Sequence, residues 1–447
     1  MRKTIATLAG LTAVALSVTG FTFDPSPTPA APVPAADPAY YSLRLPLGLS
    51  VADLTRLGFD VGHGHGSRPV LVATPSEADR LRSLGITLGK IGEVYQPIPA
   101  GRSARAADGT TFYGGYHTPV GHEQHNAAVA KAFPNLVSLF DIGDSWKKTK
   151  GTGGHDIQAL CITKKQAGDC ELNTTGKKPK FILHAQIHAR ELATGELAYR
   201  WIDHLVNSYG KDADITALVD SRELWVVPMA NPDGVDIVAS NPSKPILQRK
   251  NANNTRDCGV GSTGVDLNRN SSFEWDVNEG GPCDETNPGS GPASEPETLA
   301  IQGLVNRITR DTKGDVDEPA AAETNAVFIS LHSYGNDILA PWGYTNDEAP
   351  NRPALVALGK KMSAFNGYPV TTGDGGVGYF APGATDDWAY GTRGLPAYTF
   401  EVGPGSGACA GFLPSYTCMD STFWPKNKGA FIYAAKAAAK PYGTLPR

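Results

Sequence analysis

The stretch that most constrains the fold is a short apolar run that changes within a few residues into a helical pattern. Residues 181–187 begin Phe-Ile-Leu and predict a buried strand, whereas the apolar residues after Glu191 recur at spacings of three and four. The turn between them carries His188 and Glu191, three positions apart. Zinc accepts both an imidazole nitrogen and a carboxylate oxygen. A helix start with an acidic first turn has the same spacing, so this stretch alone leaves both interpretations open.

Strand and helix patterns alternate from residue 113 to the C-terminal region. Such interleaving predicts an α/β fold, with a mixed, largely parallel central sheet of about eight strands and helices on both faces. The expected strands are residues 135–147, 156–163, 181–187, 223–229, 326–331, 337–342 and 396–402, and the expected helices are 117–133, 192–205, 296–311, 352–366 and 426–439.

The N-terminal region has a different composition. Arg2 and Lys3 precede an uncharged apolar run that is too short to span a membrane, which predicts a secretory signal peptide over residues 1–20, with cleavage left open up to about residue 36. Residues 21–107 are expected to be a Pro/Ala-rich linker followed by a small α/β pro-segment, and 108–447 the main domain. Two arginines in the exposed stretch 97–109 suit proteolysis. The alternative is a permanent N-terminal domain.

Six cysteines fall in three local pairs, and none forms a Cys-x-x-Cys motif. Fifteen connectivities are possible in principle, and sequential pairing is the simplest. Disulfides persist outside the cytosol, so the cysteines and the signal peptide agree on a secreted protein. The expected bridges are Cys161–Cys170, Cys258–Cys283 and Cys409–Cys418.

The net charge is −5, so no basic excess exists to bind nucleic acid or an anionic membrane. We expect neither as a partner.

A third metal ligand is needed, and His332 is the best candidate among the ten histidines. It directly follows the apolar run 326–331, and open α/β sheets place their ligand-binding sites at the carboxyl ends of strands. His63 and His65 lie in a Gly-rich loop of the expected pro-segment. The His-Glu-Gln-His stretch at 122–125 lacks one residue of the H-E-x-x-H motif and is interpreted as a polar helix face.

The order strand, His-x-x-Glu, helix and then His-Ser-Tyr resembles the zinc metallocarboxypeptidase family. The resemblance is to secreted bacterial members similar to carboxypeptidases A, B and T, and it covers about residues 113–440. Further matching segments follow in the family's order: Asn231-Pro232-Asp233-Gly234, Arg249-Lys250-Asn251, Asp266-Leu267-Asn268-Arg269-Asn270, Tyr379, Asp387-Trp388 and Thr399-Phe400-Glu401.

The resemblance implies a zinc-dependent exopeptidase made as a zymogen, with 108–447 as its catalytic domain. One Zn²⁺ would be bound by His188, Glu191 and His332, and Glu401 would be the general base and then the acid. Arg249 would stabilise the oxyanion of the reaction. A free C-terminal carboxylate needs a bidentate cation, which an arginine supplies better than a lysine. The residues implied in substrate binding are Arg190, Asn268, Arg269 and Tyr379.

The side-chain preference rests on Asp386, the position that the resemblance places at the floor of the specificity pocket. A buried carboxylate there favours C-terminal Lys or Arg, whereas a partly solvated one also leaves room for apolar residues. The segment Glu401-Val402-Gly403-Pro404 departs from the Glu-Leu-Arg-Asp of the animal enzymes, which leaves the far wall of the pocket open. We expect a basic or a dual preference.

The expected partners are peptides or proteins with a free C-terminus and an activating protease, and the expected state is a monomer. Two alternatives remain at this stage. One is a peptidase of the same family acting on cell-wall peptides. The other is a catalytically dead peptide-binding homologue.

Overall fold

The computed structural model describes residues 36–64, 68–277, 280–375 and 378–443. The predicted signal peptide, most of the linker and His65 lie outside these residues. From Asp37 onward the chain belongs to one compact unit.

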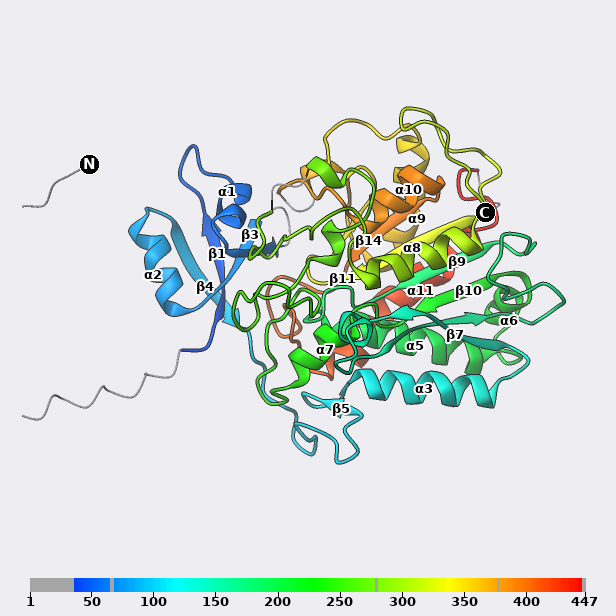
Figure 1. Cartoon of the computed structure of the whole chain (residues 1–447), viewed down its shortest axis with the longest axis horizontal. Coiled ribbons are helices and arrows are strands. Elements are labelled where there is room, and N and C mark those ends of the chain that lie inside the picture. Colours follow the sequence, from blue (N-terminus) through cyan, green and yellow to red (C-terminus); the bar gives the residue numbers. More distant parts are fainter. Residues whose placement is uncertain (1–35, 65–67, 278–279, 376–377, 444–447) are drawn as a thin grey trace, which may run out of the picture. The chain divides into compact units, whose positions relative to one another are not determined.

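Eight strands form the central sheet in the order β13-β12-β14-β11-β9-β10-β8-β7 (Figure 1). The four strands β10, β9, β11 and β14 run parallel to their neighbours in this group, and antiparallel strands flank them. The predicted mixed, largely parallel sheet of about eight strands is therefore confirmed. The strands are β7 (Val137–Asp144), β8 (Asp156–Ile162), β9 (Lys180–His184), β10 (Glu223–Val227), β11 (Ala326–His332), β12 (Asp337–Leu339), β13 (Val370–Thr371) and β14 (Ala397–Glu401).

Helices cover both faces of this sheet. The helical spacing after Glu191 forms α5, which buries Leu197, Trp201 and Leu205 completely, as an apolar stripe should. Several helices begin with proline in the first turn, where its missing N–H costs nothing. The helices are α3 (Pro119–Ala132), α4 (Trp146–Thr149), α5 (Leu192–Ser208), α6 (Ala213–Ser221), α7 (Pro232–Ala239), α8 (Pro296–Ile308), α9 (Arg352–Asn366), α10 (Thr385–Arg393) and α11 (Trp424–Ala437).

The expected small α/β unit precedes the large sheet. Its four strands pair antiparallel in the order β2-β3-β1-β4, around a core of their own that includes Leu54, Leu71 and Leu81. Ser50 and Thr74 each close a capping box at a helix start. The elements are β1 (Ala39–Arg44), α1 (Val51–Arg56), β2 (Asp60–Gly64), β3 (Arg68–Ala73), α2 (Pro75–Ser83) and β4 (Thr87–Glu93).

Short elements complete the chain. Residues 241–295 are mostly loop and include the 3₁₀ turn Leu267–Arg269. The short elements are β5 (Thr111–Phe112), β6 (Tyr116–His117), the 3₁₀ turns η1 (Leu267–Arg269), η2 (Trp275–Val277) and η3 (Gly373–Gly375), and the π-helical turn η4 (Met419–Phe423). No helix in the described part of the chain is both long and apolar enough to cross a bilayer.

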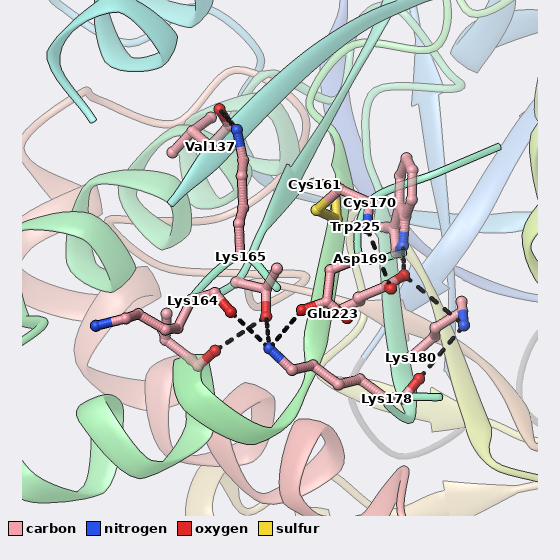
Figure 2. The surroundings of a disulfide bond; sticks show 12 residues. Val137, Cys161, Lys164, Lys165, Asp169, Cys170, Lys178, Lys180, Glu223 and Trp225 are labelled. Atoms are coloured by element: carbon pink, nitrogen blue, oxygen red, sulfur yellow. Dashed lines mark hydrogen bonds and ion pairs between the residues drawn. A yellow bond between two sulfur atoms is a disulfide. The ribbon is translucent and has the colours of Figure 1, made fainter. Parts of the chain in front are cut away.

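The three predicted disulfides, Cys161–Cys170, Cys258–Cys283 and Cys409–Cys418, are all confirmed. Figure 2 shows the first of them beside a buried ion pair, in which Lys180 Nζ lies 3.7 Å from Glu223 Oε2. The Cys170 amide donates to the other oxygen of Glu223, and Trp225 Nε1 donates to Oε2. These contacts stabilise the amino ends of β9 and β10, at the opposite ends of these strands from His184 and Val227.

His155, which directly precedes β8, connects three elements. Its Nδ1 lies 2.7 Å from Glu123 Oε1 on α3, and its Nε2 lies 2.9 Å from Asp236 Oδ2 on α7. Burial alone would lower the pKa of this imidazole, but the hydrogen bonds to Asp236 and Glu123 raise it from 6.5 to about 10. His155 is therefore a charged group that stabilises the fold at neutral pH.

Candidate active site

The three predicted metal ligands converge where neighbouring strands end. His188 and Glu191 lie on the turn between β9 and α5, and His332 is the last residue of β11, which pairs with β9. Glu191 Oε1 lies 2.7 Å from His188 Nδ1, and its Oε2 lies 3.4 Å from His332 Nδ1. All three side chains are buried. The third ligand, at a distance in the sequence, is thus brought within reach of the other two.

The donor set fits zinc. The two Nδ1 atoms of His188 and His332 face each other at 3.1 Å. The other ring nitrogens have partners, since His188 Nε2 lies 3.0 Å from Asp266 Oδ1 and His332 Nε2 lies 2.8 Å from Ser330 Oγ. With Asp266 and Ser330 accepting from the Nε2 atoms, the two Nδ1 atoms and the Glu191 carboxylate face one another. This donor set matches the His₂Glu set that a catalytic zinc site uses.

The electrostatics of these groups agree. Burial works against the ionised form of Glu191, but the adjacent His188 holds the pKa of this carboxyl far below its usual range. Burial lowers the pKa of His332 to about 4, with a smaller opposing effect of Glu191. An anionic carboxylate beside a neutral imidazole is the protonation state that metal ligands require.

Glu401 stands next to the metal ligands because β14 pairs with β11 in a register that sets Glu401 directly opposite His332. Its side chain is 8 % exposed and lines the cleft. Burial, reinforced by the negative charge of Glu191, raises the pKa of Glu401 well above its ordinary value. A carboxyl with a raised pKa at the end of a rigid strand is suited to accept and return a proton.

Arg249 is held at the other side of the ligands by Asp266. The Arg249 guanidinium donates to Asp266 Oδ2 at 2.9 Å and 3.2 Å, and its NH1 lies 3.9 Å from Glu191 Oε1. Burial opposes ionisation of Asp266, but Arg249 and then His188 keep the pKa of this carboxyl well below its usual range. Asp266 therefore orients a metal ligand and a cationic side chain at once.

Asn268 and Arg269 lie on η1, which projects them into the same cleft. The Arg269 guanidinium donates to the carbonyl of Asn268 at 2.7 Å, and its NH2 lies 3.4 Å from the hydroxyl of Tyr379. The Asn268 Oδ1 accepts the amide of Thr385 at 2.9 Å. The three predicted carboxylate-binding residues are thus brought together in this cleft.

Asp386 also lines the cleft and is 6 % exposed. Burial raises the pKa of its carboxyl, although the Thr399 hydroxyl acts in the opposite direction. A buried carboxylate of this kind is stabilised when a cation enters beside it.

Arg190 also lines the cleft, and its guanidinium is paired with a carboxylate of the small α/β unit that precedes the large sheet. Its NH1 and NH2 donate to Asp60 Oδ2 and Oδ1 at 2.7 Å and 2.8 Å, a bidentate pair with the first residue of β2. Glu285 lies 3.5 Å away, and the ring of Phe412 lies 4.1 Å from the guanidinium carbon. Asp60, Val61 and Gly62 line the same cleft as the metal ligands.

Sequence reasoning missed three functional contacts and misassigned one motif. Asp266 and Ser330 support the metal ligands, and Asp60 pairs with Arg190 across 130 positions. Ser330 was accessible to reasoning, because residues i and i+2 of a strand share a face. The interpretation of 122–125 as a polar helix face is wrong for His122, which is 3 % exposed and has a pKa that burial lowers to about 3.

Comparisons with known proteins agree with this geometry. The zinc carboxypeptidase family model matches residues 122–426. A zinc carboxypeptidase of Saccharothrix mutabilis subsp. capreolus is 29 % identical over 380 residues, which cover 82 % of this chain and 81 % of that protein. Carboxypeptidase A2 of Mus musculus is 30 % identical over 312 residues, 66 % of this chain and 64 % of its own length. The carboxypeptidase A structure from Helicoverpa armigera superposes with a TM-score of 0.69 at 20 % identity, covering 91 % of this chain and 98 % of that one.

Proposed function

Because this chain belongs to the zinc carboxypeptidase family, we propose that its cleft hydrolyses the C-terminal peptide bond of peptides and proteins. Family membership makes it a zinc-dependent metallocarboxypeptidase. The observation that carries the proposal is the convergence of His188, Glu191 and His332 beside a buried Glu401 in one cleft.

We assign the chemistry as follows. His188, Glu191 and His332 hold the metal, and bound Zn²⁺ supplies Lewis acidity and lowers the pKa of water towards neutral. Glu401 takes the proton of the attacking water and returns it to the leaving amine. Arg249, fixed by Asp266, stabilises the negative charge that develops on the carbonyl oxygen.

The carboxylate of the substrate is held by Arg269 with Asn268, and Tyr379 closes over it. A planar guanidinium binds a carboxylate through two parallel hydrogen bonds, which restricts the site to chain ends. Arg190 contributes a second cation towards the preceding part of the substrate.

The C-terminal side chain enters beside Asp386. The burial of this carboxylate supports a preference for Lys or Arg, and a protonated Asp386 would tolerate apolar residues as well. The proposed preference is therefore basic, or both basic and apolar.

Residues 21–107 are proposed as the linker and pro-segment of a zymogen, and the chain as a secreted monomer after removal of residues 1–20. The support is the Asp60–Arg190 pair and the place of residues 60–62 in the wall of the cleft. An activating protease would cleave after Arg102 or Arg105. Backbone hydrogen bonds join residues 103–106 to residues 111–114. These hydrogen bonds must break before a protease can bind residues 102–106 in an extended conformation.

The test is a substrate panel with the activated chain: hippuryl-Arg, hippuryl-Phe and a diaminopimelate peptide, each with and without a chelator. Chelator-sensitive release from hippuryl-Arg is expected to be fastest. Preferential cleavage of the diaminopimelate peptide would favour action on cell-wall peptides instead. Absence of release from all three would leave a peptide-binding homologue, a result that the presence of Glu401 and all three ligands opposes.

A further inference from the structure

A small cavity lies directly behind the turn that carries Asn268 and Arg269. Its walls come from the 267–271 turn, Thr385 at the start of α10, one face of α8, and Ile187 and Ala230, which follow β9 and β10. The lining residues on α8 are Glu297, Thr298, Ile301 and Gln302. The cavity thus lies between α8 and the turn that carries Asn268 and Arg269, called here the carboxylate-binding turn. It also adjoins the proposed specificity pocket, because the lining residue Thr385 directly precedes Asp386.

Three residues that line this cavity each carry a polar atom without a hydrogen-bond partner among the described residues: Ser271 Oγ, Thr298 Oγ1 and Gln302 Nε2. All three side chains are more than nine-tenths buried, with exposures of 1 %, 6 % and 7 %. The oxygen and nitrogen of the Gln302 amide can be exchanged in the assignment of the side chain. With either assignment, the amide atom at the present position of Nε2 has no partner among the described residues. A buried polar atom without a partner costs about 1–3 kcal/mol, so three around one cavity require an occupant.

The size and chemistry of the cavity select that occupant. It leaves about 10 Å³ for the centre of a water molecule to move in, which is room for one water. Two hydroxyls that both donate and accept, together with one amide donor, provide the usual three partners of a buried water. A single carboxylate among amide and hydroxyl donors does not make a cation site. We propose that this cavity binds one structural water that couples α8 to the carboxylate-binding turn.

Glu297 connects the cavity to the segment Arg249-Lys250-Asn251. It lines the same cavity, accepts the Trp146 amide at 2.7 Å, and accepts Asn251 Nδ2 at 3.0 Å. Asn251 in turn accepts the amide of Val265 through Oδ1 at 2.9 Å. The cavity is therefore connected to the segments that present Arg249 and Arg269, because Asn251 follows Arg249 by two residues and Val265 directly precedes Asp266. The role of the water is to position these segments and not to take part in the reaction.

A crystal structure of the full chain tests the site independently of any activity. A water within hydrogen-bond distance of Ser271 Oγ, Thr298 Oγ1 and Gln302 Nε2 is expected, and a well-defined map without one would overturn the proposal. In Thr298→Val, which keeps the shape but removes the hydroxyl, that water should be lost or displaced.

The positioning role rests on the proposed function and has its own readout. Thr298→Val should raise KM for hippuryl-Arg about 3- to 10-fold with little change in kcat, because the turn that holds the substrate carboxylate loses a water-mediated contact. Thr298→Ser keeps the hydroxyl and should restore KM. Thr309→Val is the matched control, since the Thr309 hydroxyl donates to the Val305 carbonyl of α8 and does not line the cavity. Equal KM values for Thr298→Val and Thr309→Val would refute the positioning role. If the enzyme proves inactive, only the proposed function fails, and the crystallographic result still decides the water site.

Discussion

The proposed role of the small α/β unit as a pro-segment predicts that the contact between Asp60 and Arg190 restrains access to the cleft. Asp60→Asn keeps the size of the side chain but removes its charge and one of the two hydrogen bonds that now measure 2.7 Å and 2.8 Å. The side chains of Arg190 and Asp60 are 3 % and 21 % exposed, so the pair is mostly desolvated.

The magnitude follows from that burial. Removing one partner of a fully buried ion pair costs about 3–5 kcal/mol. The cost here should be smaller, about 2 kcal/mol, because Asp60 is partly solvated and Glu285 remains 3.5 Å from Arg190. A loss of about 2 kcal/mol corresponds to a roughly 30-fold larger fraction of chains with an accessible cleft.

The assay is hydrolysis of hippuryl-Arg by uncleaved chains, normalised to the activity of the same chains after proteolytic activation. Uncleaved Asp60→Asn should be about 30-fold more active than uncleaved wild type, given the ~2 kcal/mol above. Asp79→Asn is the control, since Asp79 pairs with Arg82 on the exposed face of α2, and neither residue lines the cleft. The reasoning is refuted if Asp60→Asn is no more active than Asp79→Asn while both activate fully.

Three further predictions concern specificity and stability. In steady-state kinetics, Asp386→Asn should lower kcat/KM for hippuryl-Arg about 30- to 1,000-fold, because it removes one partner of a buried charge pair. The kcat/KM for hippuryl-Phe should stay nearly unchanged. His155 has a raised pKa of about 10, so its stabilisation is complete below pH 6.5 and is lost as the pH rises towards 10. The free energy of unfolding of wild type should therefore fall by about 1–2 kcal/mol over that range, discounted for partial exposure, and that of His155→Gln should not. Replacing Cys258 and Cys283 by Ser opens a loop with a sequence separation of 25 and should cost about 3 kcal/mol in urea unfolding.

Local patterns in the sequence predicted seven of the eight strands of the central sheet and the helices α3, α5, α8, α9 and α11, but not β13, α4, α6, α7 or α10. They also made His188, Glu191 and His332 candidate ligands, and the family resemblance then assigned all three to one Zn²⁺. The change from a strand pattern to a helical one at residues 181–205 fixed the turn that bears His188 and Glu191. His332 followed because parallel strands present their carboxyl ends at one edge of the sheet. The roles of Arg249, Arg269 and Glu401 came from the family resemblance, since no periodicity distinguishes one buried charge from another.

Apart from the Ser330–His332 contact, the contacts that support these residues were not predictable from local patterns. Asp266 reaches His188 across 78 positions, and Asp60 reaches Arg190 across 130. Such pairs depend on how loops and units pack, which hydrophobic spacing does not encode. His122 failed for a related reason: its polar neighbours suggested solvent, whereas the packing of α3 buries it.

The most direct test of the account combines zinc titration with the variant Glu401→Gln. Chelator-treated, activated wild type should regain hippuryl-Arg hydrolysis with one equivalent of Zn²⁺. Glu401→Gln should bind one equivalent with similar affinity but lose about 10²- to 10⁴-fold in kcat, because only the proton transfer is removed. Hydrolysis that persists in the chelator, or a Glu401→Gln variant as active as wild type, would contradict the assignment of His188, Glu191, His332 and Glu401.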